Sequence, residues 1–270
     1  MVNSTRVASQ LKRNVPRREY TNPPVFEVIL DLQFQRSLDE KTLRELRGHL
    51  APSFPQADQQ NLIQMVMQVG PAGQAFQDTA SQFGGWLFRD QGWVLQTSPM
   101  ALTLHSVRQG PWPTGAYVGW SVIYEKFLGL HTSLAGVYGS LGPKRAGVRY
   151  LNRIAIPKGE DISRWLGFTL RAPSLLQELY TFNLRQTWAR AGDSDDISAT
   201  VGLAKIDIED PTIAANHQGI LLDIDVFNLW IPKAPSYAEL PDWLRRAHEV
   251  ENQIFEGCIT DRLRERFDAQ

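Results

Sequence analysis

The chain has 270 residues, of which 43% are hydrophobic and 21% charged, values typical of a globular protein and not of a disordered one. Its formal net charge of −1 gives no global attraction for nucleic acid or acidic membranes. The single cysteine excludes an intramolecular disulfide and a cysteine zinc site. The sequence lacks an apolar leader and an apolar run long enough to span a bilayer. We therefore expect a soluble, cytoplasmic protein without a membrane partner.

The N-terminal segment, residues 1–22, is polar and basic and shows little apolar periodicity. Its first 20 residues carry five lysines or arginines and a single glutamate. This composition predicts a flexible basic arm, which either is a solvated tail or docks on a partner or on phosphate groups. The remainder, residues 23–270, is expected to form a single α+β domain with two halves, 23–157 and 158–270.

The first half is predicted to consist of strands and helices in turn. Asn22-Pro23-Pro24 forces extended backbone, and the alternation that follows indicates an antiparallel strand with one wet face, on which Glu27 and Asp31 lie. Residues 51–82 allow no assignment. The elements expected here are a strand over Val25–Gln35, a helix that starts near Ser37 and ends at Leu50, strands over Phe83–Arg89 and Trp93–Val107 joined at Asp90-Gln91-Gly92 and broken at Ser98-Pro99, and a helix over Trp120–Tyr138.

A strand at mid-chain, Arg145–Pro157, reads RAGVRYLNRIAIP. Alternation places Asn152 in its apolar row and puts Arg149 and Arg153 on the other face. The elements expected after it are a helical turn at Asp161–Trp165, long strands over Leu179–Ala191, Ile197–Ile208 and Ile220–Trp230, and a last helix over Leu240–Phe267.

These elements together predict an α+β fold in which long helices pack across a curved antiparallel sheet. Strands followed by a helix occur over residues 83–138 and again over residues 179–267. The order suggests two related β-β-β-α units that share one sheet. The two halves show no residue identity, so the suggested repeat is one of architecture alone.

The arginines of the mid-chain strand are the main candidate binding residues. Arg149 and Arg153 share one strand face, where they are able to clamp a phosphate or a carboxylate. The alternative, which we favour, is that they pair across strands with Glu27 or Asp31. Asn152 is either a ligand contact or, by preference, a buried structural amide whose hydrogen bonds are satisfied within the protein.

Two further acidic residues form a candidate metal site. Asp223 and Asp225 alternate with apolar residues and project from one face of a predicted strand. Together with the acidic loop at residues 193–196, they offer the several oxygen ligands that a divalent cation requires. The sequence lacks the glycine and the terminal glutamate of a calcium loop. A solvated strand face is therefore the favoured interpretation.

The sequence carries no catalytic or cofactor motif. Its five histidines form no HExxH pair, no serine lies in a GxSxG turn, and no glycine-rich phosphate loop is present. Cys258 lies on the apolar stripe of the last predicted helix, which indicates an inert buried thiol. We therefore expect no cofactor, and a protein that is not an enzyme.

The segments NPPVFEVILDLQF at residues 22–34 and RAGVRYLNRIAIP at residues 145–157 together resemble a family of sporadically distributed bacterial and archaeal proteins of similar length. Its members have an Asn-Pro-Pro strand near the start and an Arg-Tyr-Leu/Ile-Asn-Arg-Ile strand at mid-chain. The resemblance extends to the order of elements over most of the chain, and it implies no particular chemistry. The patchy occurrence of the family implies, by association, an accessory role in a mobile-element or defence system.

Three functions are open at this point. The favoured one is a non-enzymatic binding protein that presents a surface to a protein partner. The second is nucleic-acid or nucleotide binding through the basic arm with Arg149 and Arg153, which would depend strongly on salt. The third is a metal-dependent enzyme acting on a phosphorylated ligand, with Asp223 and Asp225 as metal ligands. The sequence leaves the oligomeric state open.

Overall fold

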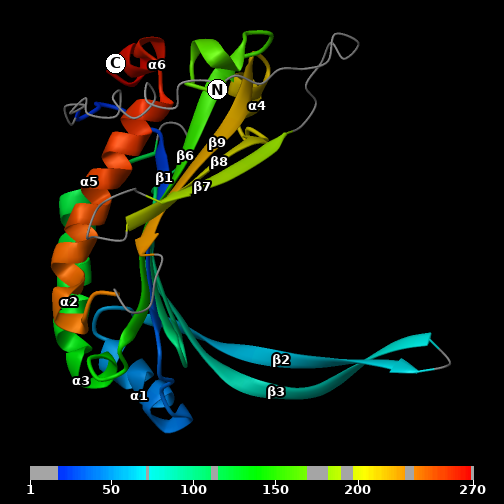
Figure 1. Cartoon of the computed structure of the whole chain (residues 1–270), viewed down its shortest axis with the longest axis vertical. Helices are drawn as coiled ribbons and strands as arrows, with labels where there is room; N and C mark the ends of the chain where they lie inside the picture. Colours follow the sequence, from blue (N-terminus) through cyan, green and yellow to red (C-terminus); the bar gives the residue numbers. More distant parts are fainter. Residues whose placement is uncertain are drawn as a thin grey trace, which may run out of the picture.

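The computed structural model describes residues 18–70, 73–110, 115–168, 182–189, 197–228 and 234–268. A single nine-stranded sheet, in which all neighbouring strands are antiparallel, runs through both halves of the chain in the order β2-β3-β4-β5-β1-β6-β9-β8-β7 (Figure 1). The predicted α+β class with a curved antiparallel sheet is confirmed. The strands are β1 Val25–Phe34, β2 Gln56–Gly70, β3 Gly73–Asp90, β4 Trp93–Ser98, β5 Ala101–Val107, β6 Pro143–Pro157, β7 Asn183–Ala189, β8 Ile197–Ile206 and β9 His217–Asn228.

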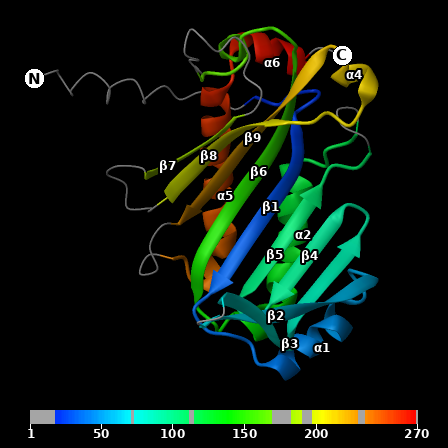
Figure 2. The same cartoon turned by 90° about the vertical axis from the view of Figure 1, so that its right-hand side faces the viewer.

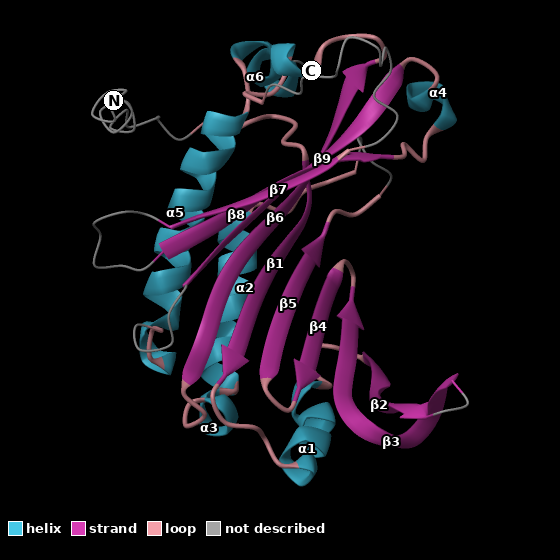
Figure 3. Ribbon diagram, turned by 45° about the vertical axis from the view of Figure 1, so that its right-hand side comes forward, coloured by secondary structure: helices cyan, strands magenta, loops and turns pink. Residues whose placement is uncertain are grey.

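Two long helices, α2 and α5, cover one face of the sheet (Figures 1 and 3). They pack against each other, since the Tyr124 hydroxyl on α2 donates a hydrogen bond to the Pro241 carbonyl at 3.2 Å. The opposite face carries no long helix in the described ranges, and we call it the open face. The helices are α1 Glu40–Leu50, α2 Trp120–Ser133, α3 Ala135–Tyr138, α4 Pro211–Ala214, α5 Leu240–Cys258 and α6 Asp261–Asp268, with short 3-10 turns at Ile162–Arg164 and Tyr237–Glu239.

Strands β1 and β6 lie side by side at the centre of the sheet, as Figure 2 shows. Val148, Tyr150 and Ile154 of β6 are buried toward α5, where the Tyr150 hydroxyl lies 2.9 Å from Nδ1 of His248. Burial of this apolar row fixes the register, because a slip by one residue would turn the charged row of β6, which includes Arg149, into the core. The predicted alternation of the mid-chain strand is therefore confirmed.

Strands β2 and β3 continue past the sheet as a two-stranded ribbon on the open-face side (Figure 1). β3 pairs with β4 only over Trp86–Asp90, whereas it pairs with β2 along its whole length. The chain turns away at a bulge at Gly85, which has a φ of +136°. A Cβ atom there would lie 1.9 Å from the Thr97 carbonyl oxygen, so the bend requires glycine. We call residues 61–83 the β2–β3 ribbon.

The strand predictions fail in one region and extend beyond the described residues in two others. The unassigned residues 51–82 form β2 and much of β3, so β3 begins ten residues before the predicted Phe83. The turn at Asp90-Gln91-Gly92 and the break at Ser98-Pro99 are confirmed. The basic arm up to residue 17, the acidic loop at 193–196 and parts of the predicted strands at 179–191 and 220–230 lie outside the described residues.

The last predicted helix, Leu240–Phe267, is wrong in one respect, because it consists of two helices. Ile259 has extended backbone, with φ −112° and ψ 153°, and forms a β-bridge with Leu166. The break directs α6 across the end of the sheet (Figure 3). No helix in the described part of the chain is both long and apolar enough to cross a membrane.

The other predicted helices differ from the structure at their ends. The helix over Trp120–Tyr138 divides at Leu134 into α2 and α3. α1 is capped by Asp39, whose carboxylate accepts a hydrogen bond from the Thr42 amide at 2.8 Å. The predicted start near Ser37 therefore lies two residues too early.

Candidate functional site

Arg149 lies on the open face and is held by a carboxylate of β9. Its Nε and Nη2 atoms each donate a hydrogen bond to one oxygen of Asp223, both at 2.7 Å, in the bidentate geometry that suits a guanidinium group. The hydrogen bonding to Asp223 raises the pKa of Arg149 above its ordinary value. The favoured ion pair is therefore present, although its carboxylate comes from β9 and not from Glu27 or Asp31.

Arg145, a residue that the sequence did not single out, links β1 to β9. Its guanidinium contacts Asp31 on one side and both oxygens of Asp225 on the other, at 2.9 and 3.0 Å. Asp225 is 8% exposed, and burial raises the pKa of this carboxyl while Arg145 opposes the rise. The sequence did contain one indication of this role. Arg145 is four residues from Arg149, so both side chains lie on the same face of the strand.

The other charged candidates have separate partners. Glu27 on β1 lies 2.6 Å from Nδ1 of His105 on β5. Arg153 stacks over the Phe26 ring, 3.5 Å from its centroid, and pairs with Glu209 at 3.3 Å. The Glu209 side chain is 85% exposed, so this ion pair contributes at most about 1 kcal/mol. The structure therefore does not bring the two predicted arginines together on one acceptor.

Asn152 lies on the opposite face of β6, in the layer between the sheet and α5. It is 1% exposed, and its Nδ2 atom donates a hydrogen bond to the Leu222 carbonyl at 3.2 Å. A buried amide needs such a partner because an unpaired polar group in the core costs about 1–3 kcal/mol. The contact is that of a structural residue, which agrees with the interpretation favoured from the sequence.

The candidate metal ligands, Asp223 and Asp225, both face arginines. Among the described residues, no cluster of three or more histidine, cysteine or acidic side chains is arranged to hold a metal ion. The polar network on the open face contains more carboxylates than guanidinium groups. Its members are Arg145, Arg149, Arg153, Glu27, Asp31, Glu209, Asp223 and Asp225. Each arginine of this network is paired with at least one carboxylate and Glu27 is paired with His105, so the network offers little attraction for phosphate groups.

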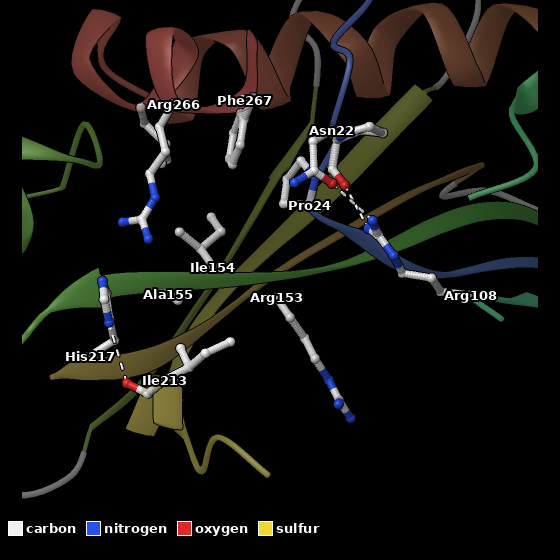
Figure 4. Close-up of a pocket in the computed structure, with 12 residues that line it drawn as sticks. Asn22, Pro24, Arg108, Arg153, Ile154, Ala155, Ile213, His217, Arg266 and Phe267 are labelled. Carbon is white, nitrogen blue, oxygen red and sulfur yellow. Dashed lines mark hydrogen bonds between the residues drawn. The ribbon is translucent and has the colours of Figure 1, made fainter. Parts of the chain in front are cut away.

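A cavity of about 200 Å³ lies at the end of the sheet beneath α6 (Figure 4). Segments far apart in the sequence meet here: the start of β1 at Asn22–Pro24, the end of β6 at Arg153–Ala155, the start of β9 at His217, and α6. The Asn22 amide donates a hydrogen bond to the Phe267 carbonyl at 2.9 Å. Both sequence segments that carry the family resemblance therefore reach this cavity.

Arg108, also missed from the sequence, fixes one wall of the cavity. It is 9% exposed, and burial lowers the pKa of its guanidinium. It donates hydrogen bonds to neutral oxygens around it: the carbonyls of Pro23 at 2.7 Å, Val25 at 3.1 Å and Gly115 at 2.5 Å, and Oδ1 of Asn22 at 3.0 Å. These bonds explain how the Asn-Pro-Pro segment is held at the cavity.

Similarity to known proteins does not help to interpret this site. Comparison of the chain with models of known protein families and with curated proteins gave no match. The resemblance carried by residues 22–34 and 145–157 therefore stays a prediction. The function has to be inferred from the described residues, chiefly those of the ribbon, the open face and the cavity.

Proposed function

We propose that this is a non-enzymatic binding protein that holds a protein partner along its β2–β3 ribbon and the adjoining open face. The observation that carries the proposal is the backbone pairing of the ribbon: among the described strands, β2 and β3 pair only with each other there, and β4 pairs with β3 only beyond the bulge at Gly85. A two-stranded hairpin without a third strand or a helix against it is marginally stable in water. A partner chain would supply the missing support.

The composition of the ribbon favours a protein as that partner. No charged residue occurs between Asp58 and Asp78, and six of the eight residues over Leu62–Val69 are apolar. An uncharged sheet edge such as that of β2 invites pairing with another chain, and proteins protect such edges with charges or cover them. Because this edge has no charge along most of its length, we infer that a partner chain covers it when the protein performs its function.

The open face favours the same class of partner. Its arginines are paired with carboxylates that outnumber them, so the face has little attraction for phosphate groups. Paired charges on a rigid sheet are already oriented, which is typical of a surface that binds a protein of complementary polarity. The nucleic-acid alternative would rest on the basic arm, and absence of a gel shift with duplex or single-stranded DNA at low salt would remove it.

We also infer that the halves 23–157 and 158–270 are related β-β-β-α units. Three successive strands in each half, β3-β4-β5 in the first and β7-β8-β9 in the second, lie next to one another on either side of the central pair β1 and β6. A long helix follows each last strand, α2 and α5 respectively. The described part of the second half has no equivalent of the ribbon. The ribbon is thus an addition that the shared fold does not need.

The proposal is tested by removing the ribbon. In one variant, residues 62–82 are replaced by a two-residue Asn-Gly turn, which closes the hairpin between the paired Asn61 and Phe83. The control is Trp188→Thr, which changes an exposed residue on β7, the strand at the other edge of the sheet. Each tagged protein is mixed with lysate of its source, and retained proteins are identified by mass spectrometry.

We expect the unmodified protein and Trp188→Thr to retain the same partner and the ribbonless variant to lose it. Circular dichroism and the melting temperature should show that the ribbonless variant stays folded, because it keeps the core residues of β1, β6, β9 and α5. Retention of the partner by the ribbonless variant at an unchanged level would contradict the proposal.

A further inference from the structure

We propose that the cavity beneath α6 binds a small organic anion, with a carboxylate or phosphate group attached to an apolar body. This site goes beyond the protein-binding function and does not depend on it. Three arginines, Arg108, Arg153 and Arg266, line the cavity together with His217, and no acidic residue lines it. Arg153 is paired with Glu209, but Arg108 and Arg266 add two permanent positive charges at a cavity of about 200 Å³, which favours an anion there.

Arg266 differs in its partners from the other two arginines of the cavity, since Arg108 is held by neutral oxygens and Arg153 pairs with Glu209. Of the three arginines on α6, Arg262 pairs with Glu160 at 2.8 Å and Arg264 pairs with Glu256 at 2.8 Å. Arg266 is half-buried, yet it makes no hydrogen bond or salt bridge with any residue that the structure describes. A guanidinium withdrawn from water in this way gains most from an acceptor that arrives with a ligand.

The unpaired guanidinium points into the cavity, as Figure 4 shows. The His217 side chain reaches toward the same space from β9, on the opposite side of β6 from α6 in this view. Its Nδ1 atom lies 3.3 Å from the Ile213 carbonyl, so Nδ1 is the donor to that oxygen, and Nε2 donates to a ligand only when the ring carries both protons. The guanidinium of Arg266 offers several N–H donors in one plane, which match the oxygens of a carboxylate or phosphate group.

The rest of the cavity explains why an organic anion fits better than a bare one. Ile154, Leu263 and Phe267 contribute apolar walls, as does the Pro23-Pro24 pair. More than half of the lining residues are apolar, so a ligand with an apolar body removes more surface from water than inorganic phosphate does. At about 200 Å³, the cavity is smaller than the roughly 300–1,000 Å³ of pockets for drug-sized ligands. The ligand is therefore a small one.

The test uses four probes and two variants of the full chain. Isothermal titration at low salt measures the binding of benzoate, phenyl phosphate, benzyl alcohol and inorganic phosphate. Arg266→Met removes the unpaired charge and keeps an apolar stem in its place. Arg262→Met is the matched control, because it removes an arginine of the same helix that is already paired with Glu160.

We expect benzoate or phenyl phosphate to bind more tightly than benzyl alcohol and inorganic phosphate. Arg266→Met should weaken that binding at least about tenfold, whereas Arg262→Met should change it by less than about threefold. The free Arg266→Met protein should melt at nearly the same temperature as the unmodified protein, because the change removes no described hydrogen bond or salt bridge and only a distant contact with the Trp165 ring, 5.6 Å from its centroid. This last readout separates a ligand-binding arginine from a structural one.

Three results would overturn the proposal. One is that neither organic anion binds with a Kd below about 10 mM. Another is that benzyl alcohol binds as well as benzoate, which would make the cavity an apolar one. The third is an equal loss of binding in Arg262→Met and Arg266→Met, which would assign the effect to the overall charge of α6 and not to the cavity.

Discussion

Arg145 is the residue whose removal should disturb the open face most. It lies between Asp31 and Asp225, whose side chains are 23% and 12% exposed. Replacement by methionine keeps most of the stem and leaves two half-buried carboxylates near each other without their cation. Breaking a fully buried pair costs about 3–5 kcal/mol, and the partial exposure here reduces the expected loss to about 2–3 kcal/mol at pH 7.

The loss in Arg145→Met should depend on pH in a defined direction. Burial already raises the pKa of Asp225 in the folded protein above its ordinary value, and Arg145 opposes this rise. Without Arg145 the folded-state pKa rises further, so folding favours the protonated carboxyl. The variant should therefore lose stability as the pH rises from about 4 toward 7, and its deficit should fall below about 1 kcal/mol at the acid end.

Urea unfolding followed by circular dichroism measures these differences. Asp225→Asn in the Arg145→Met background should recover at least half of the lost free energy of unfolding, since it removes the unpaired charge. Two results would refute the reasoning. The first is a deficit that is the same at pH 4 and pH 7. The second is an Arg145→Met protein more stable than the parent, which would mean that the arginines of the open face repel one another and await an anion.

Two other predictions concern the layer under α5. Asn152→Ala removes the hydrogen bond to the Leu222 carbonyl and should lower the free energy of unfolding by about 1–3 kcal/mol; an unchanged melting temperature would contradict a structural role. Glu251 is 2% exposed, and burial raises its pKa well above the ordinary value, so its contribution to stability is lost as the pH rises. Glu251→Gln should therefore raise the melting temperature at pH 8, by about 2–4 °C for each kcal/mol gained, and leave it unchanged near pH 4.5. A gain of equal size at both pH values would refute this assignment.

The central strands were predictable because one face of each strand is buried, and this produces alternating apolar and polar residues in the sequence. The alternation over Val25–Gln35 and Arg145–Pro157 matches the buried and exposed faces of β1 and β6. The ribbon was not predictable, because residues 62–69 read LIQMVMQV and lack a strict alternation of apolar and polar residues. The break near Ile259 depends on a β-bridge to Leu166, a contact almost a hundred residues away. Local propensity favours one continuous helix there, and the tertiary contact overrides it.

The candidate site was predictable only in its residue types. The sequence indicated that Arg149 faces carboxylates, but the choice of Asp223 follows from β9 lying beside β6. That neighbourhood depends on the strand order, which alternation does not encode. The cavity beneath α6 is assembled from five separate segments of the chain. Arg266 has no neighbour in the sequence that distinguishes it from Arg262 or Arg264, and only their partners in space do so.

The measurement that tests the binding role of the ribbon most directly is hydrogen exchange with and without the partner recovered by affinity capture. Mass spectrometry of peptides compares the exchange of backbone amides over residues 61–83 with that of α2 and α5 on the covered face. The account predicts that the partner slows exchange in the ribbon and on the neighbouring open face and leaves both helices unchanged. Protection confined to α2 and α5, with unchanged exchange in the ribbon, would contradict it.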